Sequence, residues 1–226
     1  MSADAGAPAA SDLPAVPGAA PSRRRARRRA EGGVSPVVRL FMRLQYHPAR
    51  YFNRAMYLTG KWRIWDWVDE HVLLGGAPSR REIRRLRDLG VGGVINLCEE
   101  FRGYQKHLRA AGLTQLWLPT IDYYPPTLEH VLEGLRFIAA CRRRGQRVYV
   151  HCKAGQGRST TLVMCYLMAA YRLSPRAAYR RIAEIRPHIT KRLYRRAVIG
   201  QVQRLLETGA LRGAFAPGAV PTAAQG

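Results

Sequence analysis

The sequence predicts an α/β fold in which helices flank a mainly parallel central sheet. Short apolar runs of strand length alternate along the chain with longer segments whose apolar residues recur at helical spacing. Strands separated by helices in this way are joined by crossovers, which bring the strands together in parallel. Glycines directly after three of the helical segments mark helix ends, namely Gly90, Gly112 and Gly145.

Each predicted element rests on its own pattern. Residues 148–150 (Val-Tyr-Val) are wholly apolar, which is typical of a central buried strand. Pro175 falls in the first turn of a predicted helix, where proline is tolerated. In chain order the predicted strands are residues 72–74, 91–97, 116–118 and 148–150. The predicted helices are residues 79–89, 104–111, 128–144, 159–171, 174–185 and 191–207.

Length and charge limit the domain count and the partners. The 226 residues allow one domain of about 150 residues with flanking segments, and the formal net charge is +23. Residues 1–33 hold six Arg against three acids, a net of +3, so +20 belongs to the rest. Such a chain attracts anionic lipid, phosphorylated substrates or nucleic acid. Arg-rich codon usage on a solvated face is an alternative cause of the same net charge. No RNA-binding motif accompanies the basic residues, so nucleic acid is not the expected partner.

Cysteine usage indicates free thiols rather than a disulfide framework. No Cys-x-x-Cys pair occurs, which fits a compartment that tolerates reduced cysteine. No His/Cys cluster predicts a metal site, and no cofactor is expected. No stretch approaches the roughly 18–20 apolar residues of a membrane-spanning helix. The four cysteines are Cys98, Cys141, Cys152 and Cys165.

Composition divides the chain into four parts. Residues 1–33 are Ala/Pro/Gly-rich with two Arg runs, which predicts a disordered basic arm; a cleaved transit peptide is the alternative. Residues 34–60 are amphipathic, basic and aromatic, which suits either a membrane interface or packing on the domain. Residues 61–210 form the predicted catalytic domain, and residues 211–226 a disordered tail.

Residues 148–160 (VYVHCKAGQGRST) have the layout of a phosphate-binding active site. A strand ends at His151-Cys152, a glycine loop follows, and Arg158 stands at the start of a helix. In-line attack on a phosphate monoester needs a thiolate, which is Cys152, and a bidentate cation, which is Arg158. The backbone N–H groups of the loop supply donors for the phosphate oxygens. The phosphate-binding residues are Lys153, Ala154, Gly155, Gln156, Gly157 and Arg158.

Two simpler interpretations of this loop explain only part of it. A cysteine at a strand end is often a small buried hydrophobe, and a glycine-rich turn before a helix can bind a nucleotide. Neither requires His, Cys, Gly and Arg at these offsets, and the Gly-Lys-Ser/Thr of a nucleotide loop is missing. The loop therefore predicts a cysteine-dependent phosphatase.

Three neighbours complete the predicted chemistry. Ser159 is placed to donate to the Cys152 sulfur, although it also suits an ordinary helix start. His151 is expected to hydrogen-bond the loop rather than act as a base. The leaving alkoxide needs a proton, and Asp122 is the best candidate donor because it follows a strand and precedes a proline-stiffened loop.

With these residues in place, the chain resembles the dual-specificity phosphatases of the cysteine-dependent superfamily, and within them the mitochondrial lipid phosphatases that act on phosphatidylglycerophosphate. The resemblance spans about residues 62–206 and rests on residues 65–78, 96–101, 126–138 and the Cys152 loop. It implies the dual-specificity phosphatase fold, no cofactor, a membrane-associated mitochondrial protein (otherwise cytoplasmic), and a loop flanking the pocket that contains Glu99 and Glu100. A solvated turn is the alternative for those two acids. The Tyr/Pro-rich residues 123–125 depart from the family pattern.

The predicted substrate is a lipid phosphate. Lys153, directly after the nucleophile, either adds positive charge to the pocket or contributes only its backbone N–H, and the loop resembles that of phosphoinositide 3-phosphatases of the tumour-suppressor type. The resemblance favours hydrolysis of phosphatidylglycerophosphate through a phosphocysteine at a membrane surface. A protein dual-specificity phosphatase and a phosphoinositide phosphatase are the alternatives, and an RNA 5′-triphosphatase is a more distant one.

Overall fold

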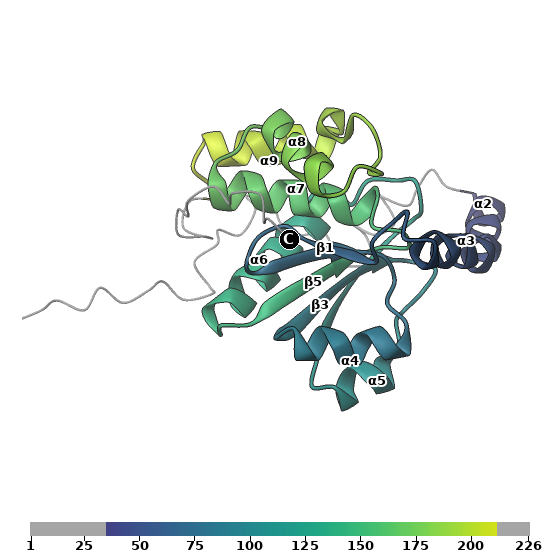
Figure 1. Cartoon of the computed structure of the whole chain (residues 1–226). Helices are drawn as coiled ribbons and strands as arrows, with labels where there is room; N and C mark the ends of the chain where they lie inside the picture. Colours follow the sequence, from purple (N-terminus) through teal and green to yellow (C-terminus); the bar gives the residue numbers. More distant parts are fainter. Residues whose placement is uncertain (1–34, 212–226) are drawn as a thin grey trace, which may run out of the picture.

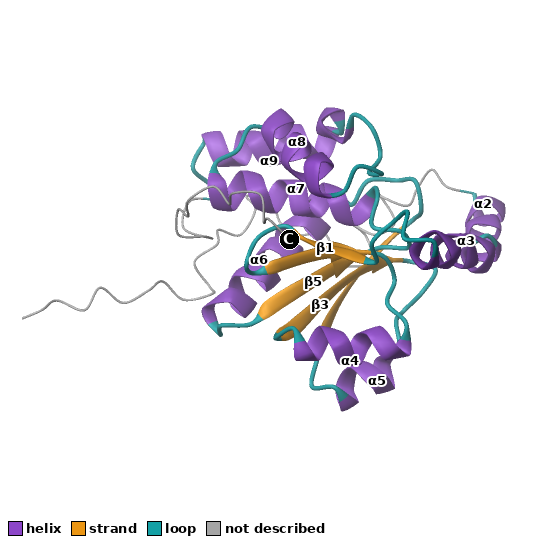
Figure 2. Ribbon diagram, in the orientation of Figure 1, coloured by secondary structure: helices purple, strands orange, loops and turns teal. Residues whose placement is uncertain are grey.

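The computed structural model describes residues 35–211, and the predictions for residues 1–33 and for 212–226 lie outside them. The described chain forms a five-stranded sheet in the order β1-β2-β5-β3-β4 (Figures 1 and 2). β1 is antiparallel to β2, and the other neighbours are parallel. The predicted α/β fold with a mainly parallel sheet is confirmed. The strands are β1 Trp65–Trp67, β2 Val72–Gly75, β3 Val91–Cys98, β4 Thr114–Thr120 and β5 Arg147–His151.

Helices cover both faces of the sheet. α4 and α5 lie on one face, and α6 to α9 gather on the other (Figure 1). The larger core lies between the sheet and the α6 to α9 layer, and the smaller one lies under α4 and α5. The helices are α2 Pro36–Leu44, α3 Tyr46–Leu58, α4 Arg80–Asp88, α5 Gln105–Ala110, α6 Leu128–Arg143, α7 Arg158–Tyr171, α8 Pro175–Ile185 and α9 Ala197–Glu207, with a 3₁₀ turn, η1, at Leu193–Arg195.

Helix starts follow the side chains that cap them. The Ser79 hydroxyl accepts from the amide of Glu82 while the Glu82 carboxylate accepts from the amide of Ser79, a reciprocal capping box at the start of α4. Thr127 and Ser174 cap α6 and α8 with a single bond each, in which the hydroxyl accepts from the amide of His130 or Ala177. Predicted helices that begin at Ser79 or Ser174 therefore include the cap residue itself.

One expectation about secondary structure was wrong, and one strand was not predicted. The single helix predicted over residues 191–207 is divided: η1 comes first, and Arg196 is extended (ψ 137°) before α9 begins. Nη1 of Arg196 donates to the Gly157 carbonyl of the Cys152 loop at 3.3 Å and to Thr161 Oγ1 of α7 at 2.7 Å. β1 was not predicted, because Trp-Asp-Trp presents no apolar run. Its central Asp66 is buried and pairs with Arg186, which is distant in the sequence.

Helices α2 and α3 join the domain in different ways. Tyr46 at the start of α3 is buried and stacks on Phe101, and Arg54 of α3 pairs with Glu82 of α4 at 2.5 Å. α2, in contrast, exposes apolar side chains, among them Leu40 and Phe41. The predicted packing on the domain therefore describes one side of α3. Apolar side chains on the rest of α2 and α3 remain exposed. Within residues 35–211, no helix has the length and apolar character that crossing a bilayer requires.

Candidate active site

The Cys152 loop lies at the carboxyl end of β5 and leads directly into α7. Residues 158–170 of α7 are all buried, so the helix that follows the Cys152 loop is fixed in the core. Gly155 has φ +72°, and a Cβ there would lie 2.6 Å from the Gly75 carbonyl oxygen. Glycine is therefore required for both the backbone conformation and the close approach of β2.

Cys152 is held as a reactive thiol. It is only 4% exposed, and its Sγ accepts a hydrogen bond from Ser159 Oγ at 3.2 Å. Burial by itself would raise the pKa of Cys152, but the Arg158 guanidinium and the Ser159 hydroxyl and amide outweigh it and lower the pKa to about 7. A large fraction of Cys152 is therefore thiolate near neutral pH.

Arg158 is oriented from two sides before any phosphate arrives. Its Nη1 and Nη2 donate to Glu100 Oε2 and Oε1, both at 2.8 Å, in a bidentate pair. Nη1 also donates to the Thr120 carbonyl at 2.8 Å. The structure thus brings Glu100 to Arg158, and it is not a solvated turn residue. Glu99 is half-buried, and its amide donates to the Thr120 carbonyl at 3.4 Å.

Asp122 lies beside the cations of the loop. Its Oδ1 is 3.0 Å from Arg158 Nη2, and its Oδ2 forms an ion pair with Lys153 Nζ. Burial alone would raise the pKa of Asp122, but Arg158 and Lys153 together hold that pKa below its usual value. Asp122, Arg158 and Lys153 therefore converge on the mouth of the Cys152 loop, as expected of a phosphate site with an adjacent acid.

His151 is neutral and points into the protein. Burial lowers the pKa of His151 to about 4, and its Nδ1 lies 3.2 Å from the Cys152 carbonyl oxygen. The ring also stacks on Tyr149 with centroids 5.5 Å apart. This placement matches the expected support of the loop and offers no base to a substrate.

Comparison with known proteins identifies the family. The model of the dual specificity phosphatase catalytic domain matches residues 72–203. The chain is 35% identical over 167 residues to phosphatidylglycerophosphate phosphatase PTPMT2 of Arabidopsis thaliana, covering 72% of this chain and 73% of that protein. It is 42% identical over 137 residues to phosphatidylglycerophosphatase and protein-tyrosine phosphatase 1 of Mus musculus, covering 56% and 71%. The chain belongs to the dual specificity phosphatase family.

A solved structure supports the same assignment. The crystal structure of PTPMT1 in complex with PI(5)P superposes with a TM-score of 0.59 at 34% identity, covering 65% of this chain and 99% of that chain. This dual specificity phosphatase is accordingly an enzyme with a cysteine nucleophile, and the fold implied by the sequence resemblance is confirmed.

Sequence reasoning missed the residues that clamp the outer side of the phosphatase loop. Arg186, wholly buried, donates from Nη2 to the Ala154 carbonyl at 2.9 Å and from Nε to the Gly155 carbonyl at 3.0 Å. Its Nη1 pairs with Asp66 Oδ2 at 2.6 Å. Because a trans peptide points its C=O and N–H in opposite directions, clamping these two carbonyls turns the following amides, those of Gly155 and Gln156, the other way. One signal was available: Arg186 directly follows a predicted helix and directly precedes a proline. Helical periodicity alone places such an arginine in solvent.

The low pKa of Cys152 predicts fast alkylation at neutral pH. The rate of modification by iodoacetamide should rise with pH around a midpoint of about 7, since the thiolate is the attacking form. Burial raises the pKa of each of the other thiols, so the Cys152→Ser variant measures their slower background. Ser159→Ala should move the midpoint upward by removing a donor to sulfur. A wild-type midpoint above 8 would contradict this arrangement.

Proposed function

We propose that this phosphatase hydrolyses the phosphomonoester of an anionic phospholipid, with phosphatidylglycerophosphate as the substrate it fits best. The observation that carries the proposal is two largely buried cations at the Cys152 loop: the side chain of Arg158 is 2% exposed and that of Lys153 is 10% exposed. Phosphatidylglycerophosphate carries a phosphodiester close to its phosphomonoester, so two cations suit it better than one. The names of the Arabidopsis and mouse relatives support the same substrate.

The proposal gives each reacting group a role. The Cys152 thiolate attacks phosphorus, the S–P bond forms as the P–O bond breaks, and Asp122 gives its proton to the leaving alkoxide. Arg158 and the amides of residues 153–157 hold the three equatorial oxygens. Water then attacks the phosphocysteine, Asp122 takes a proton from it, and Ser159 stabilises the departing thiolate. Alcohol and inorganic phosphate are the products.

Asp122 must be protonated for the first step, although its neighbours lower its pKa. A phosphate dianion in the loop would draw Arg158 and Lys153 into contact with its own oxygens, and its charge would disfavour the carboxylate. Both effects raise the pKa of Asp122 in the substrate complex. Substrate binding itself therefore prepares the acid.

The phosphatase is proposed to work at a membrane surface. Apolar residues of α2 and α3 are exposed, and Tyr123 and Tyr124, which follow Asp122 in the chain, are 71% and 46% exposed. Lys153 Nζ lies 5.9 Å from the centre of the Tyr123 ring, so this exposed tyrosine borders the Cys152 loop. Tyrosine suits the membrane–water interface because its ring is apolar and its hydroxyl is polar. The sequence resemblance extends the proposal to a mitochondrial membrane.

A phosphate-release panel tests the substrate. Phosphatidylglycerophosphate is expected to give a kcat/KM at least about tenfold above phosphoinositides and phosphotyrosine peptides, a difference of about 1.4 kcal/mol in transition-state binding. Faster hydrolysis of the phosphopeptide would instead favour the alternative, a protein dual-specificity phosphatase, which the name of the mouse relative also allows.

An Asp122→Asn arm of the same panel tests the acid. The variant should lose roughly 10²-fold or more on the alkyl phosphate of the lipid and much less on an aryl phosphate, whose leaving group needs no proton. Equal losses on both substrates would show that another group supplies the proton.

A further inference from the structure

Helix α4 carries an arginine face that the catalytic site does not use. All five of its arginines are exposed, and the buried acid in the helix, Glu82, is committed to Ser79 and to Arg54. Within residues 35–211, ion pairs of the α4 arginines with a carboxylate are absent. The arginines are Arg80, Arg81, Arg84, Arg85 and Arg87.

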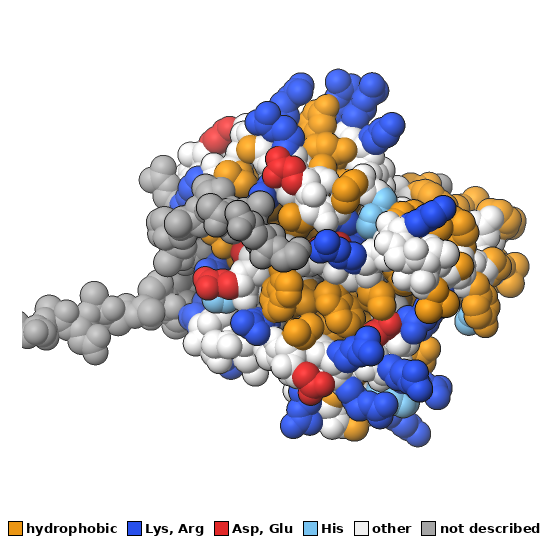
Figure 3. Space-filling model, in the orientation of Figure 1, with side chains coloured by type: hydrophobic (Ala, Val, Ile, Leu, Met, Phe, Trp, Pro, Cys, Tyr) orange, Lys and Arg blue, Asp and Glu red, His pale blue; other side chains and the backbone are white. Residues whose placement is uncertain are grey.

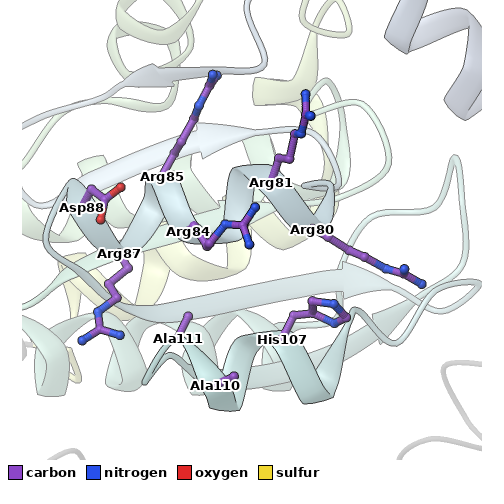
Figure 4. A pocket seen from close by; sticks show the side chains of 9 residues that line it. All are labelled: Arg80, Arg81, Arg84, Arg85, Arg87, Asp88, His107, Ala110 and Ala111. Atoms are coloured by element: carbon purple, nitrogen blue, oxygen red, sulfur yellow. The ribbon is translucent and has the colours of Figure 1, made fainter.

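Part of this face lines a hollow between α4 and α5. The hollow has a volume of about 840 Å³, and its lining includes Arg80, Arg84, Arg87 and one acid, Asp88, from α4 and His107 from α5 (Figure 4). Figure 4 shows Arg81 and Arg85 pointing away from α5. The Arg80 guanidinium lies over the ring of Tyr104, 5.2 Å from its centre, which limits its freedom. None of the lining residues belongs to the Cys152 site.

Several like charges lie close together on this face, with Asp88 as the acid at the far end of the helix. Arg80 and Arg84 are four residues apart on one helix, as are Arg81 and Arg85, and like charges at this spacing repel. Arg80 and Arg81 also occupy the first turn, where the helix dipole favours anions. A phosphate group held by guanidinium forks would relieve both effects, and guanidinium matches phosphate geometry.

The neighbouring helices indicate which anion this is. α3 contacts the start of α4 and of α5, with Arg54 paired to Glu82 and Arg50 Nη2 donating to the Tyr104 hydroxyl at 3.2 Å. Figure 3 shows basic side chains over α4 and α5 close to the apolar side chains over α2 and α3. Leu40 of α2 is 59% exposed. An exposed apolar helix beside a basic hollow suits an anionic bilayer, whereas nucleic acid would make no use of the apolar part.

We propose that the hollow lined by Arg80, Arg84, Arg87 and His107 binds phosphate headgroups of an anionic bilayer while α2 and α3 enter its interface. The hollow is a second phosphate site, separate from catalysis, that holds the enzyme on the surface supplying its substrate. This inference deepens the proposed function and rests on it for the identity of that surface.

Sedimentation with vesicles tests the proposal. The full chain carrying Cys152→Ser is mixed with vesicles of phosphatidylglycerol and phosphatidylcholine, and its partition is compared with that of the same chain also carrying Arg80→Gln, Arg84→Gln and Arg87→Gln. The triple substitution should weaken binding roughly 100-fold, because each basic residue near an anionic surface contributes about a factor of five. Binding should also fall as salt rises.

A matched control removes the same charge elsewhere. Arg136→Gln, Arg143→Gln and Arg204→Gln alter exposed arginines on the opposite helical layer. They should leave vesicle binding within about threefold of the parent, because the electrostatic attraction to an anionic surface falls off within a Debye length. With Cys152 intact, both triple variants should hydrolyse a soluble aryl phosphate at the parent rate. Equal losses in the two triple variants or unchanged vesicle binding in the α4 variant would each overturn the proposal. In a parallel titration with RNA, a loss in the α4 variant that is absent on vesicles would overturn it in favour of nucleic acid. Vesicle binding that depends on α4 without phosphatidylglycerophosphate hydrolysis would refute the proposed substrate alone.

Discussion

Replacing Cys152 by Ser is expected to abolish phosphate release, with a loss of about 10⁴-fold or more, as for removal of the nucleophile from other covalent hydrolases. The reason is protonation: the pKa of Cys152 is lowered to about 7, whereas a serine hydroxyl in the same place stays neutral. Phosphate formed from phosphatidylglycerophosphate in a single turnover, with enzyme in saturating excess over substrate, measures the loss in the chemical steps.

The fold of this variant should be preserved. Oxygen for sulfur keeps the shape of the side chain, and Ser159 still has an acceptor, so the thermal midpoint should stay within a few degrees of the parent. Cys141→Ala is the matched control: Cys141 is buried in α6, away from the loop, and its loss should leave kcat near the parent value. Phosphate release by Cys152→Ser above about 1% of the parent rate would remove the basis for a phosphocysteine.

The central part of the site could be predicted from sequence because it is local. The strand, the loop and the start of α7 follow one another over residues 147–158, so spacing alone places Cys152 and Arg158 around one phosphate. Asp122 could be inferred as well, since β4 ends at Thr120 and the carboxyl ends of parallel strands share one edge of the sheet.

The contacts that orient this loop could not be predicted in the same way. Glu100 reaches Arg158 because β3 pairs with β5, and the sequence offered two adjacent acids with no means of choosing between them. Arg186 reaches the loop from the end of α8, and its partner Asp66 lies on β1, a strand of three residues. Periodicity predicts which face of an element is apolar, but it does not predict which two distant charges will be buried together.

The second large effect is expected from Arg186→Met. This change leaves the Asp66 carboxylate buried without its partner at 2.6 Å, and breaking such a pair costs about 3–5 kcal/mol of unfolding free energy. It also releases the carbonyls of Ala154 and Gly155. We therefore expect a lower midpoint in urea and, in protein that is still folded, a lower kcat together with a Cys152 alkylation midpoint above 7.

The double variant Arg186→Met with Asp66→Asn separates the two effects. Without the orphaned carboxylate, much of the lost stability should return, but the loop carbonyls stay unclamped, so kcat and the alkylation midpoint should not recover. Arg63→Gln is the matched control, because Arg63 also faces Asp66, at 3.8 Å, yet its side chain is 74% exposed. An exposed pair of this kind contributes at most about 1 kcal/mol, so this variant should stay close to the parent in both measurements. If the double variant regained kcat along with stability, Arg186 would support only the fold; if stability returns alone, Arg186 positions the amides that hold the phosphate.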